Sequence, residues 1–303
     1  MGSVIFQSWY EGARRMKVAF IGAGGIGGPM AECLSHKGTD LLLCDMREAA
    51  LAPFRALGVQ VTQRVADCAG ADFVIVMVAT DDQVRSVLLG DDGLLPAIDT
   101  AAPPRVIVMS SVLPATVREV AAALAVKNVV LLDAPVSGAA VAAREGRLTI
   151  MAGGESADLA AALPLLTRLG SHIVHCGPLG SGEAVKIVNN ILGVSNMFLM
   201  AEAMLLATEL GIDADRLAGI MEQSSGRNFA TRDYATHKSL YRLNTQTPEA
   251  LQALLAICRK DLALAQALAE SRKLSLPLLE AIKTRMEDTP NASIADGWRK
   301  LAG

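Results

Sequence analysis

Two side chains near the middle of the chain, Lys186 and Asn190, have types and a spacing that suit proton transfer. They lie four residues apart, so a helix would place them on the same face. A lysine can donate or accept a proton, and an asparagine beside it can hold a small polar substrate. The alternative is a solvated lysine and an exposed asparagine on an ordinary amphipathic helix. The chemical interpretation is favoured by the preceding glycine-rich loop, with Gly177, Gly180 and Gly182, because such a loop lets a ligand approach the backbone closely.

A glycine motif near the start of the chain predicts a dinucleotide site. The run Lys17–Ile21 has the composition of a short buried strand, and it leads through G-x-G-x-x-G into a predicted helix that ends near His36. In this motif the first glycine makes a tight turn, the second lets a pyrophosphate touch the backbone, and the third lets the helix pack on the strand. The helix N-terminus attracts the anion. The residues that we predict to contact the dinucleotide here are Gly22, Gly24, Gly25, Ile26 and Gly27.

An aspartate after the second predicted strand bears on the choice between NAD and NADP. Asp45 follows the strand Asp40–Cys44 and lies 18 residues after Gly27, close to the spacing of about 20 expected for the acid that binds the adenosine ribose. A carboxylate there would repel a 2′-phosphate, which favours NAD. Arg47 favours NADP, because its guanidinium could pair with the 2′-phosphate of that dinucleotide. The remaining alternative for Asp45 is a helix N-cap ahead of Glu48. The sequence therefore favours NAD and leaves NADP open.

Strand and helix signals alternate over the first 180 residues. Runs such as Asp72–Val78 are apolar enough for a strand buried on both faces, and a hairpin-like strand is predicted at 148–152. This alternation predicts an α/β fold with a Rossmann-type, doubly wound parallel sheet, whose ligands bind at the carboxyl ends of the strands. Ser110, Ser111 and Ser137 follow predicted strands. Each alone is an ordinary turn residue, but their shared place makes the set a candidate site.

After Asn190 the strand signals stop and helical periods dominate. The helices predicted in this part are 183–210, 213–222, 249–269, 277–286 and 294–301. Residues 223–248 are predicted to be loop-rich and able to reach over a site. Within the helix 249–269, Lys260 and Asp261 interrupt a Leu/Ala-rich sequence, either as a solvated pair or with the lysine facing a cofactor.

These signals predict three parts of the chain. Residues 1–15 form an N-terminal extension, residues 16–180 a dinucleotide-binding domain, and residues 181–303 an all-α domain for substrate binding and oligomerisation. A long helix that begins the all-α domain joins it to the dinucleotide-binding domain.

The composition argues against several other classes of protein. The net charge of −3 gives no electrostatic case for nucleic acid or for an anionic membrane surface. The five cysteines contain no C-x-x-C pair, which indicates free thiols in a reducing compartment and no metal or disulfide framework. No window of 18 consecutive apolar residues suits a membrane-spanning helix. We therefore expect a cytoplasmic protein without a membrane partner.

Four blocks of sequence resemble the β-hydroxyacid dehydrogenase family, which includes 3-hydroxyisobutyrate dehydrogenase and tartronate semialdehyde reductase. They follow the order and spacing of the family, and the match covers about residues 16–300. The blocks are Phe20–Ala31, Asp133–Gly138, Gly177–Asn190 and Lys260–Ala265. Where the family usually has Ser-Gly-Gly, Ala139 replaces the second glycine. Asn189 stands where the 6-phosphogluconate dehydrogenase branch has a histidine, which argues against a sugar phosphate substrate.

The resemblance implies roles for individual residues. Lys186 matches the catalytic acid/base, and Asn190 matches the residue that helps it by holding the substrate. Ser137 and Gly138 match the positions that bind the substrate carboxylate, and Ser111 and Lys260 match positions near the nicotinamide. Family members form homodimers or homotetramers, and the same is expected of this chain.

The predicted function is reversible hydride transfer between NAD(P) and a small β-hydroxy acid, of the 3-hydroxyisobutyrate type. An amine with an ordinary pKa of about 10.4 must have that pKa lowered by burial or by neighbouring cations to act as the base. The first alternative is an NADPH-dependent reductase of short aldehydes such as glyoxylate, succinic semialdehyde or tartronate semialdehyde. The second is a non-catalytic dinucleotide sensor, against which the Lys186/Asn190 pair argues.

Overall fold

The computed structural model describes residues 16–302, so the predicted extension, residues 1–15, lies outside the described residues. The chain divides into two compact units, and the boundary between them follows Lys186. One helix, α8 (Ser181–Glu209), continues from the first unit into the second.

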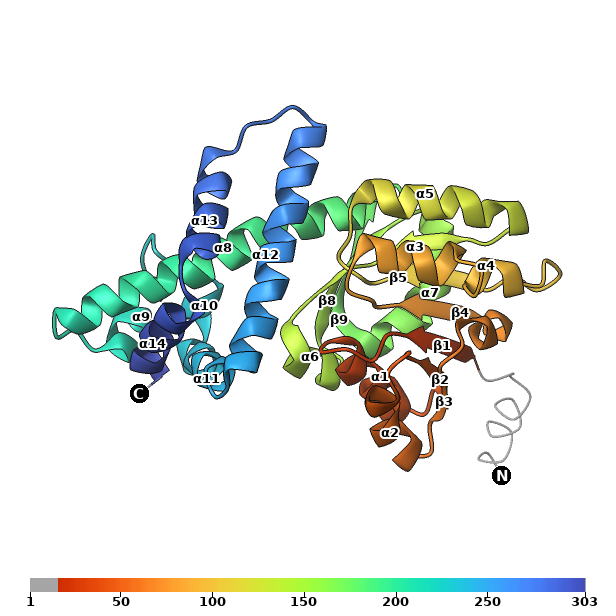
Figure 1. The fold of residues 1–303 in the computed structure, drawn as a ribbon, viewed down its shortest axis with the longest axis horizontal. Helices are drawn as coiled ribbons and strands as arrows, with labels where there is room; N and C mark the ends of the chain where they lie inside the picture. Colours follow the sequence, from red (N-terminus) through yellow and green to blue (C-terminus); the bar gives the residue numbers. More distant parts are fainter. Residues whose placement is uncertain (1–15, 303) are drawn as a thin grey trace, which may run out of the picture. The chain divides into compact units, whose positions relative to one another are not determined.

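Within residues 16–302, the first unit is built on a nine-stranded sheet (Figure 1). The strand order is β3-β2-β1-β4-β5-β6-β8-β7, with β9 paired to β8. The strands are β1 Lys17–Ile21, β2 Asp40–Cys44, β3 Gln60–Thr62, β4 Phe73–Val76, β5 Arg105–Val108, β6 Leu131–Asp133, β7 Val136–Ser137, β8 Leu148–Gly153 and β9 Gly170–Gly177. Most of the central strands are short runs rich in Val, Ile and Leu, which suit a sheet buried on both faces.

The sheet is parallel from β3 to β6 and mixed beyond β6. Strand β8 runs antiparallel to β6 and β7 and parallel to β9. The predicted parallel sheet is therefore found from β3 to β6, and the hairpin-like strand predicted at 148–152 is β8, which runs antiparallel to its neighbours β6 and β7. The helix between β7 and β8 has seven residues, fewer than the dozen or so that a parallel crossover requires, so the chain reverses direction instead.

Helices cover both faces of the sheet, as the doubly wound prediction requires. They are α1 Gly27–His36, α2 Glu48–Ala56, α3 Asp81–Leu89, α4 Leu94–Ala97, α5 Pro114–Leu124, α6 Ala139–Glu145 and α7 Ser156–Leu169, with the 3₁₀ helices η1 Val65–Gly70 and η2 Ala125–Lys127. One apolar cluster joins α1 and α7 to one face through residues such as Leu34 and Leu166. A second cluster joins α3 and α5 to the other face through Leu88 and Val120. The predicted Rossmann-type fold is confirmed.

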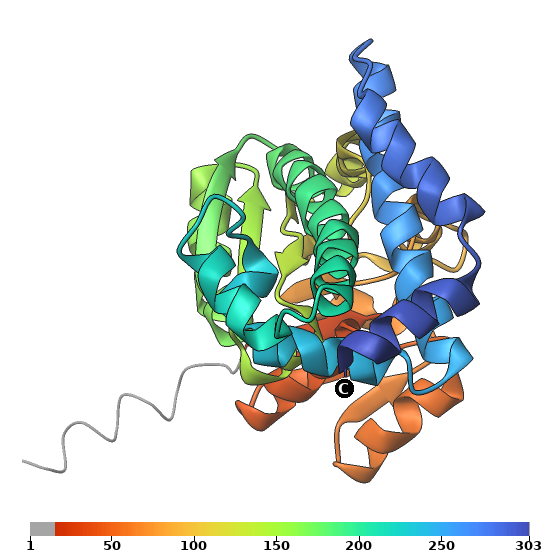
Figure 2. The ribbon, with the colours of Figure 1, turned by 90° about the vertical axis from the view of Figure 1, so that its left-hand side faces the viewer.

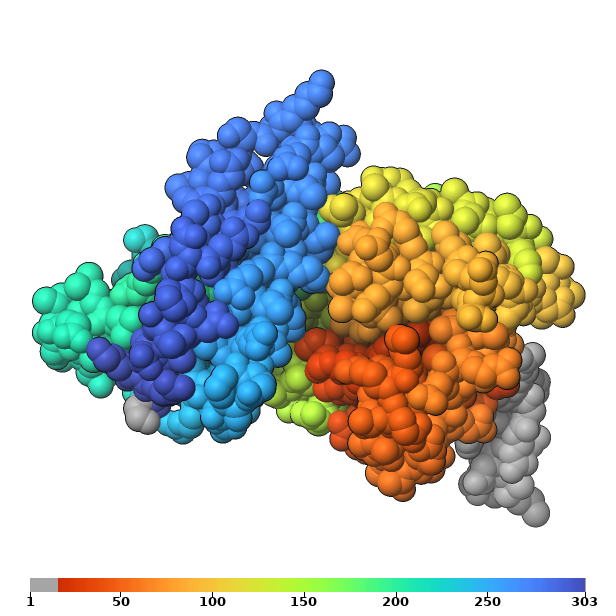
Figure 3. Space-filling model, in the orientation of Figure 1, coloured from red at the N-terminus to blue at the C-terminus, as the bar shows by residue number. Residues whose placement is uncertain are grey.

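The described residues of the second unit form helices and the turns that connect them, with no strand, which confirms the all-α prediction. Besides the C-terminal part of α8 it contains α9 Ala214–Glu222, α10 Phe229–Arg232, α11 Tyr234–Asn244, α12 Pro248–Ser271, α13 Pro277–Asp288 and α14 Asn291–Ala302. Figure 2 shows these helices with α8 in green and α12 to α14 in blue. Helices α12 and α13 lie side by side, and their side chains pack together in the space-filling view (Figure 3).

The prediction of a loop over residues 223–248 is wrong, because most of this segment forms α10 and α11. Its polar residues act as helix caps. The Asn228 side chain accepts a hydrogen bond from the backbone of Ala230, and the Asp233 side chain accepts one from Thr236. Such residues stop one helix and start the next.

Aromatic side chains hold α8, α11 and α14 together. The ring of Tyr241 lies 4.7 Å from His237 and 5.1 Å from Trp298, and Trp298 lies 5.8 Å from Phe198 of α8. The Nε2 atom of His237 and the hydroxyl of Tyr241 are 3.1 Å apart. Burial lowers the pKa of His237 to about 4, so the imidazole is neutral in the folded protein at neutral pH.

We expect the free energy of unfolding to fall as the pH drops from about 6.5 to about 4, because the unfolded state takes up a proton at His237 before the folded state does. Above about pH 6.5 this contribution is fully present, and below about pH 4 it is lost. A pKa difference of this size corresponds to about 3 kcal/mol. Urea unfolding of the wild type and of His237→Phe at pH 7.5 and pH 5 measures it. An equal pH dependence in both proteins would contradict this prediction.

Helix α8 is, within the described part of the chain, the one helix long and apolar enough to cross a membrane. Length and composition alone are weak evidence, because core helices of globular proteins meet the same criterion. Met200 and Met204 of this helix are buried within the unit, whereas Leu199 and Leu206 are exposed. The helix therefore has one packed face and one apolar face exposed in the monomer.

Candidate active site

The glycine motif forms the turn from β1 into α1 at the carboxyl edge of the sheet. Gly22 has φ +106°, and a Cβ atom on it would lie 2.2 Å from the carbonyl oxygen of Met77, which follows β4. A Cβ atom on Gly27 would lie 2.0 Å from the carbonyl oxygen of Gly22. These two glycines are therefore required by the turn and by its close approach to neighbouring backbone. Strands β1 and β4 flank the point at which the strand order reverses, where ligands bind in sheets of this type.

Gly24 and Gly25 differ from the other glycines of the motif. Apart from the adjoining residues of the chain, no atom lies within 4 Å of a Cβ built on either residue. The fold therefore leaves free space beside this stretch of backbone, just ahead of the N-terminus of α1. A diphosphate would fit against such a surface, because backbone N–H groups and the helix dipole attract anions.

We expect Gly24→Ala to fold like the wild type and to raise the Kd for the dinucleotide at least about tenfold, about 1.4 kcal/mol. The added methyl group has room in the protein but takes space that a diphosphate needs. Gly28→Ala is the matched control, because its Cβ would make only an ordinary contact 3.5 Å from Ala23. Isothermal titration calorimetry with each dinucleotide and a thermal melt measure both properties. Unchanged affinity in Gly24→Ala would place the diphosphate elsewhere.

Asp45 lies beside the glycine motif and is held there by several donors. Its Oδ2 atom accepts a hydrogen bond from the backbone N–H of Ala23 (2.8 Å), and Oδ1 accepts one from the backbone N–H of Arg47 (2.9 Å). The guanidinium of Arg47 donates to both oxygens at 3.0 Å. Burial raises the pKa of Asp45, but these donors outweigh burial and hold the pKa below its ordinary value. The carboxylate is therefore ionised, and Arg47, whose side chain is 64% exposed, is its partner.

Two of the three predicted serines, Ser110 and Ser111, follow the end of β5. Ser110 is fully buried, and its hydroxyl accepts a hydrogen bond from the backbone N–H of Val78 (2.8 Å), which joins the ends of β4 and β5. Ser110 is therefore part of the framework. Ser111 follows it and is partly exposed at the same edge. Asp81 fixes the loop after β5 by accepting hydrogen bonds from the Leu113 backbone and the Thr116 hydroxyl.

Ser137 and Gly138 lie at the turn from β7 into α6. Ser137 is half-buried and Gly138 is exposed, with φ +139°. Only glycine adopts this backbone conformation at low cost. Ala139, which replaces a family glycine, has φ +59°, a left-handed conformation that costs a non-glycine residue about 1–2 kcal/mol. This turn therefore carries some backbone strain at Ala139.

Lys186 lies in the second turn of α8 and is 8% exposed. Two carboxylates tie the first turn of this helix to the sheet. Asp133, at the end of β6, accepts hydrogen bonds from the backbone N–H groups of Gly180 (2.7 Å) and Glu183 (2.8 Å). The Oε2 atom of Glu183 accepts one from the backbone N–H of Val112 (3.1 Å), after β5.

Asn190 and Lys260 share one carboxylate in the second unit. The Nδ2 atom of Asn190 donates to Oδ2 of Asp261 at 2.7 Å, and the Nζ atom of Lys260 lies 3.0 Å from Oδ1 of Asp261. Asp261 is 8% exposed. Because the acceptor is a carboxylate, the amide of Asn190 must turn its NH₂ group toward it. The structure thus brings together two predicted site residues, through a third that was noted in the sequence without a role.

Three buried carboxylates, Asp133 and Glu183 in the first unit and Asp261 in the second, were not predicted as site residues. Each makes contacts with residues about 50–70 positions away in the sequence, and spacing along the chain does not reveal such contacts. Their signal is an acidic residue inside an otherwise apolar strand or helix. Among the described residues, no cluster of three or more His, Cys, Asp or Glu could hold a metal ion.

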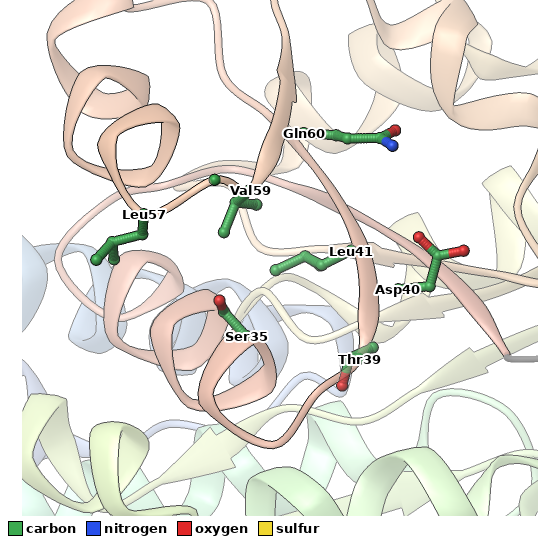
Figure 4. A pocket seen from close by; sticks show the side chains of 8 residues that line it. Ser35, Thr39, Asp40, Leu41, Leu57, Val59 and Gln60 are labelled. Carbon is green, nitrogen blue, oxygen red and sulfur yellow. The ribbon is translucent and has the colours of Figure 1, made fainter.

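A hollow of about 400 Å³ in the first unit lies away from these residues (Figure 4). It is lined by Ser35, Thr39, Asp40, Leu41, Leu57, Gly58, Val59 and Gln60. These residues lie at the amino ends of β2 and β3, the edge opposite to Asp45. The hollow is therefore separate from the predicted dinucleotide site.

Comparison with known protein families assigns both parts of the chain. Residues 17–177 match the NAD binding domain of 6-phosphogluconate dehydrogenase. Residues 180–297 match the NAD-binding domain of NADP-dependent 3-hydroxyisobutyrate dehydrogenase. A 3-hydroxyisobutyrate dehydrogenase of Pseudomonas aeruginosa is 37% identical over 263 residues, 86% of this chain and 88% of the relative. An NAD-dependent L-serine dehydrogenase of the same organism is 36% identical with the same coverage.

Solved structures agree with these sequence matches. A 3-hydroxyisobutyrate dehydrogenase from Salmonella typhimurium is 28% identical, with a TM-score of 0.76 over 91% of this chain and 95% of that one. The Mycobacterium tuberculosis enzyme of the same name, described with L-serine, is 27% identical, with a TM-score of 0.73 over 90% of this chain and 93% of that one. The glycine turn, the Lys186 helix and the coverage of both units agree with these matches, and the chain belongs to the β-hydroxyacid dehydrogenase family.

Proposed function

We propose that this protein is an NAD(P)-dependent dehydrogenase of small β-hydroxy acids, similar to 3-hydroxyisobutyrate dehydrogenase, with Lys186 as its general acid/base. The observation that carries the proposal is the helix α8, which presents Lys186 in its second turn and Asn190 one turn further on. Its first turn is tied to the strand ends that face the dinucleotide region. A protein that only senses a dinucleotide would not need this pair, and the named relatives are dehydrogenases.

The residues of this chain divide the chemistry between them. In oxidation, the amine of Lys186 takes the proton of the substrate hydroxyl, and in reduction its ammonium returns a proton to the oxygen. Asn190, with its NH₂ group directed to Asp261, holds the substrate beside Lys186. Ser137 and Gly138 bind the substrate carboxylate. The nicotinamide of the bound dinucleotide supplies the site that accepts or delivers the hydride.

A substrate panel tests the proposal. The initial rates of NAD⁺ and NADP⁺ reduction should be measured with 3-hydroxyisobutyrate, L-serine and other small β-hydroxy acids. These two acids come first because relatives carry them in their names or descriptions. Turnover of one acid well above the others supports the proposal and identifies the substrate. Tight dinucleotide binding without turnover of any acid would contradict it.

We further propose that NAD is preferred over NADP. The ionised carboxylate of Asp45 can accept hydrogen bonds from the adenosine ribose and repels a 2′-phosphate. We expect Asp45→Ala to reduce kcat/KM for NAD⁺ about tenfold or more, since hydrogen bonds to charged groups contribute about 1.5–3 kcal/mol. Arg47→Ala should lower the use of NADP⁺ only, because it removes the exposed guanidinium that could pair with a 2′-phosphate. A larger loss with NAD⁺ in Arg47→Ala would contradict this assignment.

A second candidate function is the reduction of short aldehydes such as glyoxylate, succinic semialdehyde or tartronate semialdehyde by NADPH. The exposed guanidinium of Arg47 favours it, because it can turn from Asp45 to a 2′-phosphate. The same Lys186 would then act mainly as the acid. Comparison of NADPH with NADH oxidation in the presence of each aldehyde separates the two candidates.

We also propose that the protein forms a homodimer or homotetramer. Along α8 and at the residue that follows it, the large apolar side chains that the monomer leaves exposed are Val185, Val188, Leu192, Leu199, Leu206 and Leu210. Their spacing of three, four or seven residues gives one stripe, and a partner subunit would remove it from water. Light scattering of the wild type and of Leu199→Glu measures the mass in solution.

The five cysteines are free, which supports the expected cytoplasmic location.

A further inference from the structure

A buried carboxylate holds the start of the helix that carries Lys186. Asp133 has no exposed surface, and it accepts hydrogen bonds from the backbone N–H groups of Gly180 and Glu183, which lie 47 and 50 residues later in the chain. These N–H groups have no partner within the helix, because the first turn lacks preceding carbonyls. Asp133 therefore serves as an N-cap supplied by the sheet and not by the residue before the helix.

The surrounding backbone leaves room for this one side chain. A Cβ atom on Gly153 of β8 would lie 2.4 Å from Oδ1 of Asp133. A Cβ atom on Gly182 of α8 would lie 2.2 Å from the carbonyl oxygen of Met151 and 2.9 Å from Oδ2 of Asp133. Two glycines thus let β8 and α8 approach the carboxylate from two directions. Burial raises the pKa of Asp133, and the N–H groups of Gly180 and Glu183 oppose this rise. A cap that only stabilised a helix would not need such a site, because an exposed aspartate serves equally well.

The same residue connects the two parts of the proposed active site that lie in the first unit. Asp133 begins the segment 133–138, which contains Ser137 and Gly138, and it binds the first turn of α8, one turn before Lys186. Glu183 adds a second connection through the backbone of Val112, next to Ser111. The first turn of α8 is therefore fixed to the ends of both β5 and β6.

We infer that Asp133 is a positioning residue. It fixes the position of α8 along the helix axis and the rotation of α8 about that axis, and thereby places the amine of Lys186 relative to Ser137 and Gly138. This inference rests on the proposed function of Lys186. Displacement of a reacting group by about 1 Å can reduce a rate about 100-fold. Asp133→Asn has the same shape, but its NH₂ group would face a backbone N–H and cannot accept from it. We expect kcat to fall about 10- to 100-fold, with the Kd for the dinucleotide changed by less than about threefold.

A double-mutant cycle with Lys186→Ala tests whether Asp133 acts through Lys186. If it does, Asp133→Asn lowers kcat in the wild-type background but by less than about twofold when Lys186 is already absent. Equal losses in both backgrounds would overturn the inference. The control is Asp213→Asn, because Asp213 caps α9 by accepting from the backbone N–H of Arg216 (2.8 Å) and lies outside the proposed site. It should leave kcat unchanged.

Amide hydrogen exchange provides a readout that does not depend on turnover. Asp133→Asn should lose protection at residues 183–186 by at least about tenfold, whereas Asp213→Asn should lose it only in α9. This readout distinguishes failure of the inference from failure of the proposed function. Even if the wild type were inactive on every acid, the loss of protection in Asp133→Asn relative to the wild type could be measured. If Asp133→Asn does not fold, Asp133→Ser replaces it, since a hydroxyl can still accept one of the two bonds. Failure of both variants to fold would overturn the inference in favour of a role in the stability of the whole unit.

Discussion

Lys186→Ala is expected to reduce kcat for the oxidation of a β-hydroxy acid by about 10²- to 10⁴-fold, the usual contribution of a general acid/base. The Kd for the dinucleotide should change by less than about threefold. The reason is positional: the contacts predicted for the diphosphate and the adenosine ribose, from Gly22 to Asp45, belong to the loops after β1 and β2, whereas Lys186 is held on α8. Steady-state kinetics with the best acid of the panel and calorimetric titration of the dinucleotide measure the two quantities separately.

Lys186→Arg distinguishes proton transfer from a simple need for positive charge. A guanidinium keeps the charge but does not release its proton near neutral pH, so this variant should be as slow as Lys186→Ala. An active Lys186→Arg would limit the role of Lys186 to electrostatic binding of the acid. The matched control is Lys300→Ala, because Lys300 is an exposed helical lysine whose closest carboxylate, on Glu209, is 3.9 Å away. Equal losses of turnover and of dinucleotide affinity in Lys186→Ala would indicate a structural role.

Much of the fold follows from local signals in the sequence. The turn from β1 into α1 was predictable because its two required glycines have local causes. Gly27 lies against the backbone of Gly22 within the motif, and Gly22 lies against the backbone of Met77, just after the adjacent strand β4. The apolar run that forms β4 has no other plausible place than the centre of a sheet. The hairpin-like strand that forms β8 was predicted, but its direction relative to β6 and β9 was not, because that direction depends on pairing with distant strands and not on the composition of β8.

The helices of residues 223–248 were missed for a different reason. Asn228 and Asp233 are typical loop residues, but here they cap α10 and α11. The spacing of Tyr234, His237 and Tyr241, three and four residues apart, is the helical signal that the polar composition obscured. All three are buried.

The residues of the candidate site likewise fall into two groups, those with a local signal in the sequence and those whose roles depend on distant contacts. Lys186 and Asn190 were found because their four-residue spacing has a meaning on a helix, and Asp45 because its distance from the glycine motif is characteristic. Asp133 and Asp261 act on residues 47 and 71 positions away. Their roles appear only when the fold brings a buried carboxylate to a backbone N–H or to an amide.

Asp261→Ala is the second large effect that we expect, a loss of roughly 10- to 100-fold in kcat/KM for the acid. Asp261 is buried and accepts from Nδ2 of Asn190 at 2.7 Å, while Lys260 pairs with its other oxygen at 3.0 Å. Removal of the carboxylate takes away the short hydrogen bond that orients the amide of Asn190, which then keeps the longer one that its Oδ1 accepts from Nδ2 of Asn189 at 3.4 Å. It also removes the anion beside Lys260. A hydrogen bond to a charged group contributes about 1.5–3 kcal/mol, and this range corresponds to the stated loss if it is expressed in substrate binding.

Asp261→Asn should have a smaller effect than Asp261→Ala, because its carbonyl oxygen can still accept from Asn190 while the ion pair with Lys260 is lost. Asp215→Ala is the control, since Asp215 forms an exposed ion pair with Lys238 at 3.3 Å in the same unit, and such pairs contribute about 0–1 kcal/mol. Kinetics and urea unfolding should be measured on all three variants. If Asp261→Ala is less stable but keeps the kcat/KM of the wild type wherever it is folded, then Asp261 supports the helices only, and Asn190 must be oriented by the substrate itself.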